Sequence, residues 1–183
     1  MIDRRSLLAA LGVALIAGPA FAQQTPSAAQ IERSLEAAPR MRLPEAKRVT
    51  RGEIRRRPEL RHAAPSIDIQ SINFAFGSAE IPYSEREKVE QIAKALKRIL
   101  RRRRGEVFLI EGHTDAVGSF ESNLALSERR AASLKRDLAR YFNVSPRSLE
   151  TVGYGEEYLL VPTQREEWRN RRVTIRRITD FIR

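Results

Sequence analysis

Residues 111–131, EGHTDAVGSFESNLALSERRA, place side chains of opposite charge within a short stretch of the chain. His113 and Asp115 lie in a turn between glycines, and Asn123 and Arg130 follow it. Four kinds of chemistry use such groups: a catalytic acid and base, a metal site, a salt-bridged turn, and a pocket for a ligand that carries both an ammonium and a carboxylate.

Catalysis and metal binding both lack their other components in this sequence. His113 and Asp115 could form a base and its orienting acid, but the chain has no Cys and no G-x-S-x-G nucleophile motif. A zinc site needs about three His, Cys or carboxylate ligands, and the only other histidine, His62, lies in a Pro- and Arg-rich segment. The sequence therefore predicts no enzyme, no metal site and no cofactor.

Asp115 and Arg130 remain as two opposite charges. Asp115 follows an apolar predicted strand, and α/β sheets hold ligands at such strand ends. Arg130 lies about two helical turns after Asn123, so both can face the loop that carries Asp115. A simple salt bridge is one outcome, worth about 0–1 kcal/mol if exposed. Held slightly apart, the guanidinium would bind a carboxylate and Asp115 an ammonium, the pattern of an amino-acid head group. For His113 we expect a supporting role under the loop.

Apolar periodicity predicts the elements that position this loop. Strands are expected at 67–76, 107–110, 149–153 and 173–178, and helices from a capping box at Ser84 to the arginines before Gly105 and over 120–142. The order strand, helix, strand, helix, strand, loop, strand predicts an α/β (α+β) fold. We expect a two-layer sandwich with both helices on one face of a mixed sheet.

The N-terminal third has a different composition. Residues 1–22 combine two arginines, a short apolar run and an Ala-Phe-Ala cleavage pattern, which predicts a signal peptide rather than a membrane span. No transmembrane segment is expected after cleavage. Residues 23–65 are rich in Ala, Pro and Arg, so a basic linker or arm is predicted there. The folded domain is expected over 66–183.

The net charge is +11, which favours polyanionic partners. Export makes nucleic acid the least expected of these. An anionic envelope surface, contacted through the arginines between Arg40 and Arg61, is the alternative that the charge leaves open.

Four motifs together resemble one known family. INFAFGSAEI, the segment 111–131, VGYGEE and NRRVTI are similar to the peptidoglycan-binding C-terminal domain of the OmpA family in order, spacing and residue type, over about residues 67–178. The resemblance implies that the ligand is the peptide stem of peptidoglycan, typically its diaminopimelate. The implied ligand-binding residues are Asp115, Arg130, Thr114, Asn123, Leu124, Asn170 and Arg171, with His113 and Arg172 as support. Gly77 stands where the family often has Asp.

The same resemblance implies a cellular role. We expect a free-standing, non-enzymatic periplasmic protein in the envelope of a Gram-negative bacterium, which anchors to the cell wall without a covalent bond. The alternative is an exported adaptor whose basic arm binds an anionic partner or membrane surface, with a degenerate wall pocket.

Overall fold

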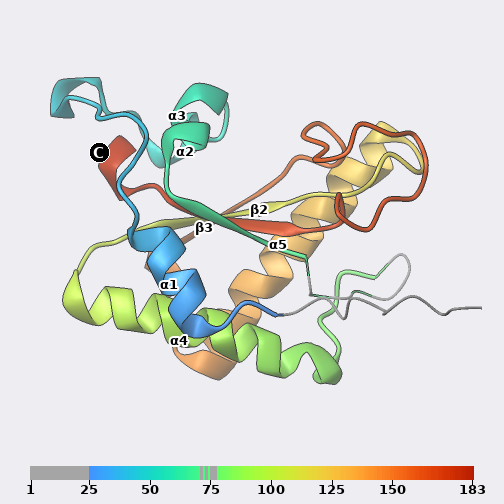
Figure 1. The fold of residues 1–183 in the computed structure, drawn as a ribbon, viewed down its shortest axis with the longest axis horizontal. Helices are drawn as coiled ribbons and strands as arrows, with labels where there is room; N and C mark the ends of the chain where they lie inside the picture. Colours follow the sequence, from blue (N-terminus) through green and yellow to red (C-terminus); the bar gives the residue numbers. More distant parts are fainter. Residues whose placement is uncertain (1–24, 71, 73, 75–77) are drawn as a thin grey trace, which may run out of the picture.

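A four-stranded mixed sheet forms the centre of the molecule (Figure 1). The computed structural model describes residues 25–70, 72, 74 and 78–183, so the predicted signal peptide and Gly77 lie outside the described residues. The strands are β1 (Ser66–Ile69), β2 (Phe108–Gly112), β3 (Leu149–Gly153) and β4 (Val173–Arg177), in the order β1-β4-β2-β3. β4 is antiparallel to both neighbours, and β2 and β3 are parallel. This arrangement places the start of β4 beside the end of β2.

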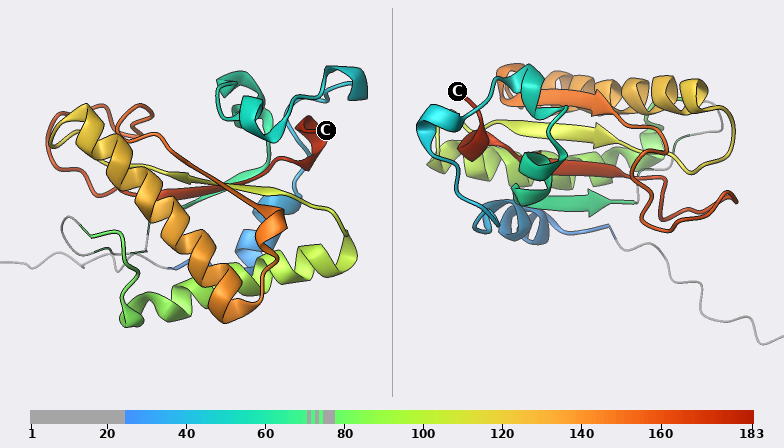
Figure 2. Two further views of the ribbon diagram at one scale, coloured as in Figure 1. Left: turned by 180° about the vertical axis from the view of Figure 1, so that it is seen from behind. Right: turned by 90° about the horizontal axis from the view of Figure 1, so that it is seen from above.

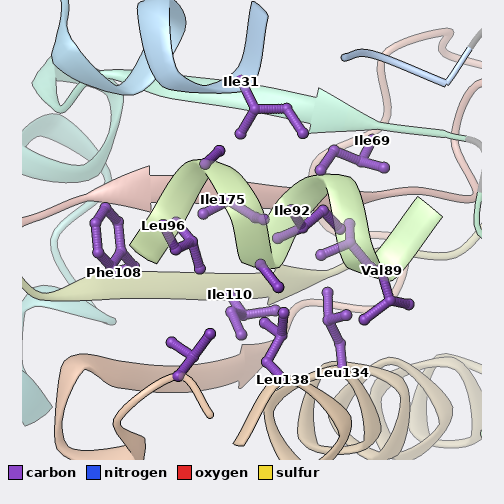
Figure 3. Close-up of a cluster of buried hydrophobic side chains, with 14 of the residues drawn as sticks. Ile31, Ile69, Val89, Ile92, Leu96, Phe108, Ile110, Leu134, Leu138 and Ile175 are labelled. Atoms are coloured by element: carbon purple, nitrogen blue, oxygen red, sulfur yellow. The ribbon is translucent and has the colours of Figure 1, made fainter. Parts of the chain in front are cut away.

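The two long helices cover one face of this sheet (Figure 2). They are α4 (Arg86–Arg102) and α5 (Phe120–Phe142). Each presents an apolar stripe at three- and four-residue spacing, and each fully buried aliphatic side chain contributes about 1.5–3 kcal/mol. Figure 3 labels members of the resulting core: Ile31, Ile69, Val89, Ile92, Leu96, Phe108, Ile110, Leu134, Leu138 and Ile175. The predicted mixed α/β fold is confirmed.

Short elements complete the chain. They are helices α1 (Ala28–Glu36), α2 (Arg51–Ile54) and α3 (Pro58–Ala63), and 3-10 turns at Glu45–Lys47, Tyr83–Glu85, Pro146–Ser148 and Thr179–Phe181. α4 begins at Arg86 after a 3-10 turn, and its N-cap Glu85 makes no capping side-chain hydrogen bond, so the capping box predicted at Ser84 is wrong. None of the helices in the described part of the chain combines the length and apolarity needed to cross a membrane.

The N-terminal segment differs from the expected linker or arm. Ile31 and Leu35, one helical turn apart on α1, are fully buried beside α4. Ile54 and Leu60, from α2 and α3, are buried with Leu109 on the opposite face of the sheet. The segment has too few apolar residues to form its own core, but the sheet supplies the surface that covers them. Residues 28–63 therefore include parts of the folded body.

Ion pairs hold the N-terminal helices to the sheet. On β3, Glu150 accepts from Arg51 at 3.2 Å and from Arg55 at 2.9 Å. On β2, the fully buried Glu111 accepts from Arg61 at 2.9 Å and from Arg176 at 2.8 Å. The guanidinium of Arg61 also lies over the Tyr154 ring, 4.0 Å from its centre. The buried Glu111 carboxylate can keep its charge in the interior only because Arg61 and Arg176 pair with it.

Two glycines allow α5 to lie directly against the sheet. A Cβ added to Gly112, at the end of β2, would lie 2.2 Å from the carbonyl oxygen of Ser127. A Cβ on Gly153, at the end of β3, would lie 2.4 Å from the Glu128 backbone nitrogen. Both obstacles are backbone atoms of α5, so a side chain at either position would push the helix away.

We expect Gly112→Ala to lower the free energy of unfolding by about 1–3 kcal/mol, because overpacking must displace α5. Gly52→Ala is the matched control. It lies in α2 with no atom within 4 Å of the added methyl, and Ala should gain about 0.5–1 kcal/mol over Gly in a helix. Urea unfolding of both variants measures the difference. Equal stability of the two variants would contradict the close contact.

The buried charges predict acid lability. Burial alone would raise the pKa of Glu111, but the neighbouring His113 and the charges of Arg176 and Arg61 lower it from its usual 4.5 to about 2. Burial also lowers the pKa of His113. Both Glu111 and His113 therefore bind protons more weakly in the folded chain than in the unfolded chain. Stability is therefore complete above pH 6.5 and declines below it, first through His113 and then, between about pH 4.5 and 2, through Glu111.

The share of Glu111 amounts to about 3 kcal/mol at most. Unfolding by urea across pH 2–7 measures it, and Glu111→Gln should remove the slope below pH 4.5 while lowering stability at neutral pH. Glu90→Gln, in an exposed pair with Lys94, should follow the wild-type slope. A Glu111→Gln variant with the wild-type pH dependence would show that this carboxylate does not control it.

Candidate functional site

The loop after β2 is held on both sides by its neighbours. The His113 N–H donates to the Arg172 carbonyl at 3.0 Å, and the Thr114 N–H donates to the Gly155 carbonyl at 2.9 Å. The first bond extends the β2–β4 pairing and the second ties the loop to the end of β3. Asp115 follows directly and is only 7% exposed. The backbone thus fixes the Asp115 carboxylate beside the carboxyl ends of β2 and β3.

The direct partner of Asp115 is Arg171. Its Nη1 lies 2.7 Å from Asp115 Oδ2, and 43% of its side chain is exposed. The sequence predicted Asp115 and Arg130 as the two poles of the site, and Arg171 only as a residue implied by the family. Arg171 lies two residues before β4, and the pairing of Gly112 with Val173 brings it to Asp115. The sequence spacing held no signal for this ion pair, because it depends on the strand order.

Arg130 lies in the same site without a carboxylate of its own. Within the described residues, no acidic side chain is within salt-bridge distance of it. Its Nε donates to the Ser78 carbonyl at 3.3 Å, and its guanidinium is 4.8 Å from the Phe74 ring centre. Burial, and then the charge of Arg171, lowers the pKa of Arg130, while Asp115 opposes this. An anion bound here would offset the cost of two neighbouring cations.

Asn123 and Leu124 lie on the first turns of α5. The Asn123 amide donates to the Val117 carbonyl at 3.2 Å and to a Glu156 carboxylate oxygen at 2.6 Å. It therefore links the loop after β2 to the loop after β3. Leu124 is half-buried, and its carbonyl accepts from Ser127 Oγ at 2.8 Å. Asn123 thus holds the loop that carries Asp115, whereas the contact of Leu124 lies within α5.

Thr114 and Asn170 are buried side chains of different kinds. The hydroxyl of Thr114 has no hydrogen-bond partner among the described residues. Asn170 is fully buried, and its side-chain amide makes two hydrogen bonds to the Val161 backbone. Asn170 Oδ1 accepts from the Val161 N–H at 2.9 Å, and Asn170 Nδ2 donates to the Val161 carbonyl at 2.8 Å. Asn170 thus braces the segment before β4 and does not open toward the site.

Arg172 and His113 form the wall behind the site. Arg172 donates to the Tyr158 carbonyl at 3.0 Å, and its Nε lies 3.5 Å from Asp68. His113 is 3% exposed, with Nε2 3.8 Å from Glu111 Oε2. Both side chains are directed at groups of the sheet. Among the described residues of the site, no hydrogen bond or ion pair joins His113 to Asp115.

Four of these residues, His113, Arg130, Arg171 and Arg172, border a cavity of about 140 Å³, and Asp115 pairs with one of them, Arg171. The cavity is lined by Gln70, Ile72, Phe74, His113, Arg130, Trp168, Arg171 and Arg172. Neither Gln70 nor Trp168 was predicted as a site residue: Gln70 lay inside the strand expected at 67–76, whereas β1 ends at Ile69, and Trp168 lies in an irregular segment. The only available signal was that Trp168 is the single tryptophan of the chain. No group of three His, Cys, Asp or Glu side chains in the described part of the chain could hold a metal ion.

Parts of the chain are similar in sequence to known proteins. The chain is 36% identical over 111 residues to the peptidoglycan-associated lipoprotein of Pseudomonas putida, covering 60% of this chain and 63% of that protein. It is 35% identical over 111 residues to the Pseudomonas aeruginosa protein of the same name, covering 60% of this chain and 62% of the relative. The matched region thus spans less than two thirds of these relatives.

Solved structures and a family model extend the comparison. The periplasmic domain of Helicobacter pylori MotB (residues 78–256) superposes with a TM-score of 0.52 at 24% identity, over 63% of this chain and 76% of that one, which supports the fold. The model of the OmpA family matches residues 73–173. The match to this family confirms the prediction of a non-enzymatic protein. Because the match covers more than half of the sequence, the chain belongs to the OmpA family.

Proposed function

We propose that the protein binds peptidoglycan non-covalently, through the diaminopimelate of its peptide stem. The observation that carries the proposal is a pair of opposite charges beside one cavity. The Arg130 guanidinium lines the cavity and has no carboxylate of its own among the described residues, and the buried Asp115 carboxylate lies 2.7 Å from Arg171, which lines the same cavity. The far end of diaminopimelate carries an ammonium and a carboxylate on one carbon. The names of the Pseudomonas relatives support peptidoglycan as the polymer that is bound.

Each charge of the ligand has a suitable partner. Arg130 uses Nε for the Ser78 carbonyl, so its two terminal nitrogens can donate side by side to the ligand carboxylate. Asp115 uses Oδ2 for Arg171, and a carboxylate has further lone pairs with which to accept from the ammonium. Arg171 fixes Asp115 and adds a second positive charge near the ligand carboxylate. The existing ion pair therefore need not break.

The remaining surfaces suit the rest of the ligand. Between its two ends diaminopimelate is a chain of methylene groups, and the cavity offers Ile72, Phe74 and Trp168 as apolar walls. Thr114, Asn123 and Leu124 keep the loop of Asp115 in place. We assign Asn170, Arg172 and His113 to bracing, because their polar groups are directed at the protein.

The proposal includes a cellular location. The matched Pseudomonas relatives are named peptidoglycan-associated lipoproteins, which supports a location at the cell wall. Export through residues 1–22 would bring this chain to the periplasm, where binding would anchor it to the wall. The alternative role of a basic arm that binds an anionic surface has less support. Arg51, Arg55 and Arg61, three of the arginines assigned to that arm, already pair with Glu150 and Glu111.

Co-sedimentation with purified, protein-free peptidoglycan tests the pocket. We expect Arg130→Gln and Asp115→Asn each to weaken binding at least about tenfold, or ~1.4 kcal/mol, because each leaves one ligand charge unpaired. Arg129→Gln removes the same charge from the next, exposed residue and should bind like wild type. Free diaminopimelate should compete.

Salt separates pocket binding from surface attraction. Exposed charges are largely screened at moderate ionic strength, so binding by the pocket should survive where binding by the surface arginines is lost. Undiminished retention of both pocket variants, with circular dichroism showing intact folds, would refute the assignment of the site.

A further inference from the structure

A second hollow lies between the start of α4 and the end of α5. Two adjoining cavities of about 460 and 560 Å³ share Tyr83, Arg86, Tyr141 and Phe142 as walls. The 3-10 turn Tyr83–Glu85 forms one rim and the last turns of α5 form the other. We call this feature the α4–α5 groove. The cavity lined by Arg130 and Arg171, proposed above to bind the peptide stem and called the stem pocket from here on, does not include this groove.

Aromatic rings and guanidinium groups alternate along the groove. The guanidinium of Arg86 lies 5.2 Å from the Tyr83 ring centre and 4.6 Å from that of Tyr141. The Arg140 guanidinium lies 5.5 Å from the Tyr141 ring centre. Tyr83 is 82% exposed and Tyr141 is 49% exposed. Large aromatic side chains that are held in place yet open to solvent are typical of binding surfaces.

The charges of the groove favour a neutral polar ligand. Three arginines line it, and four acidic side chains stand near them: Arg86, Arg136 and Arg140 against Glu80, Glu87, Glu90 and Asp137. Arg136 already lies 3.9 Å from Asp137, and Arg86 lies between two rings. The groove thus offers hydrogen-bond donors and acceptors beside aromatic faces, without a strong net charge. A polyanion would find little attraction here.

The groove and the cavity lined by Arg130 lie along the same side of α5. Arg130, Asp137 and Tyr141 are separated by seven and eleven residues, so they point within about 20° of one direction. The distance from Arg130 to Tyr141 along the helix is about 16 Å. Between them, Ser78 accepts from Arg130, and Glu80 and Ile81 of the same segment line the groove. One extended ligand could therefore reach both sites.

We propose that the α4–α5 groove is a carbohydrate subsite that binds the glycan of the polymer whose stem occupies the pocket. This inference rests on the proposed function. The faces of Tyr83 and Tyr141 that Arg86 does not cover can stack on the C–H faces of N-acetylated amino sugars, while Arg136, Arg140 and Asp137 pair with hydroxyl and acetamido groups. A stem held at Arg130 would keep the glycan at high local concentration, so a weak subsite suffices.

Titration of the full-length chain with chitotetraose, a tetramer of N-acetylglucosamine without peptide or charge, tests the subsite by NMR or calorimetry. Tyr141→Ala and Tyr83→Ala should each weaken its binding about tenfold, or ~1.4 kcal/mol, and leave diaminopimelate binding unchanged. Tyr141→Phe keeps the ring and should retain binding. Phe120→Ala removes an aromatic ring of similar exposure, 47%, on the same helix outside the groove, and should change neither ligand. Arg130→Gln should lose diaminopimelate alone.

The outcomes distinguish the two proposals. Chitotetraose that fails to bind, or binds equally to wild type and to both tyrosine-to-alanine variants, would overturn the subsite even if diaminopimelate binds. Saturable chitotetraose binding that requires Tyr83 and Tyr141 would support the groove as a carbohydrate site. If diaminopimelate then failed to bind, only the stem pocket would be refuted.

Discussion

The contact between α5 and the ends of β2 and β3 determines the geometry of the site. Gly112 and Gly153 let the backbone at Ser127 touch the sheet without an intervening side chain. Arg130 lies one turn after Ser127 and Asn123 one turn before it, so both are brought to the loop of Asp115 by the same contact. The positions of the charges then follow from the backbone and do not depend on their own attraction.

The sequence predicted some of these features and missed others for physical reasons. The bounds of α5 and β3 agree to the residue. α5 has a strong helical period and ends at Asn143, whose backbone is left-handed. The packing of residues 28–63 against the sheet was missed, since their few apolar residues are buried only by distant parts of the chain. The Asp115–Arg171 pair was missed likewise. Local patterns report on elements, whereas contacts across the sheet depend on strand order.

The two faces of the sheet have different tasks. One carries the apolar core with α4 and α5, and the other holds a buried network in which Glu111 joins Arg61, Arg176 and His113. His113 belongs to this network and also lines the cavity. The network thus fixes the wall of the cavity from behind and links it to α3. A residue of the N-terminal segment, Arg61, therefore supports the site without touching it.

The two outer strands bear on the behaviour of the protein when many copies crowd on one surface. A sheet edge with free backbone groups can recruit a strand of a neighbouring molecule and start aggregation. Here β1 has only four residues and carries the exposed Asp68. The other edge, β3, carries Glu150 under Arg51 and Arg55. The short length of β1 and the paired charges on β3 oppose edge-to-edge pairing, so we expect crowded copies of the protein to resist forming fibrils.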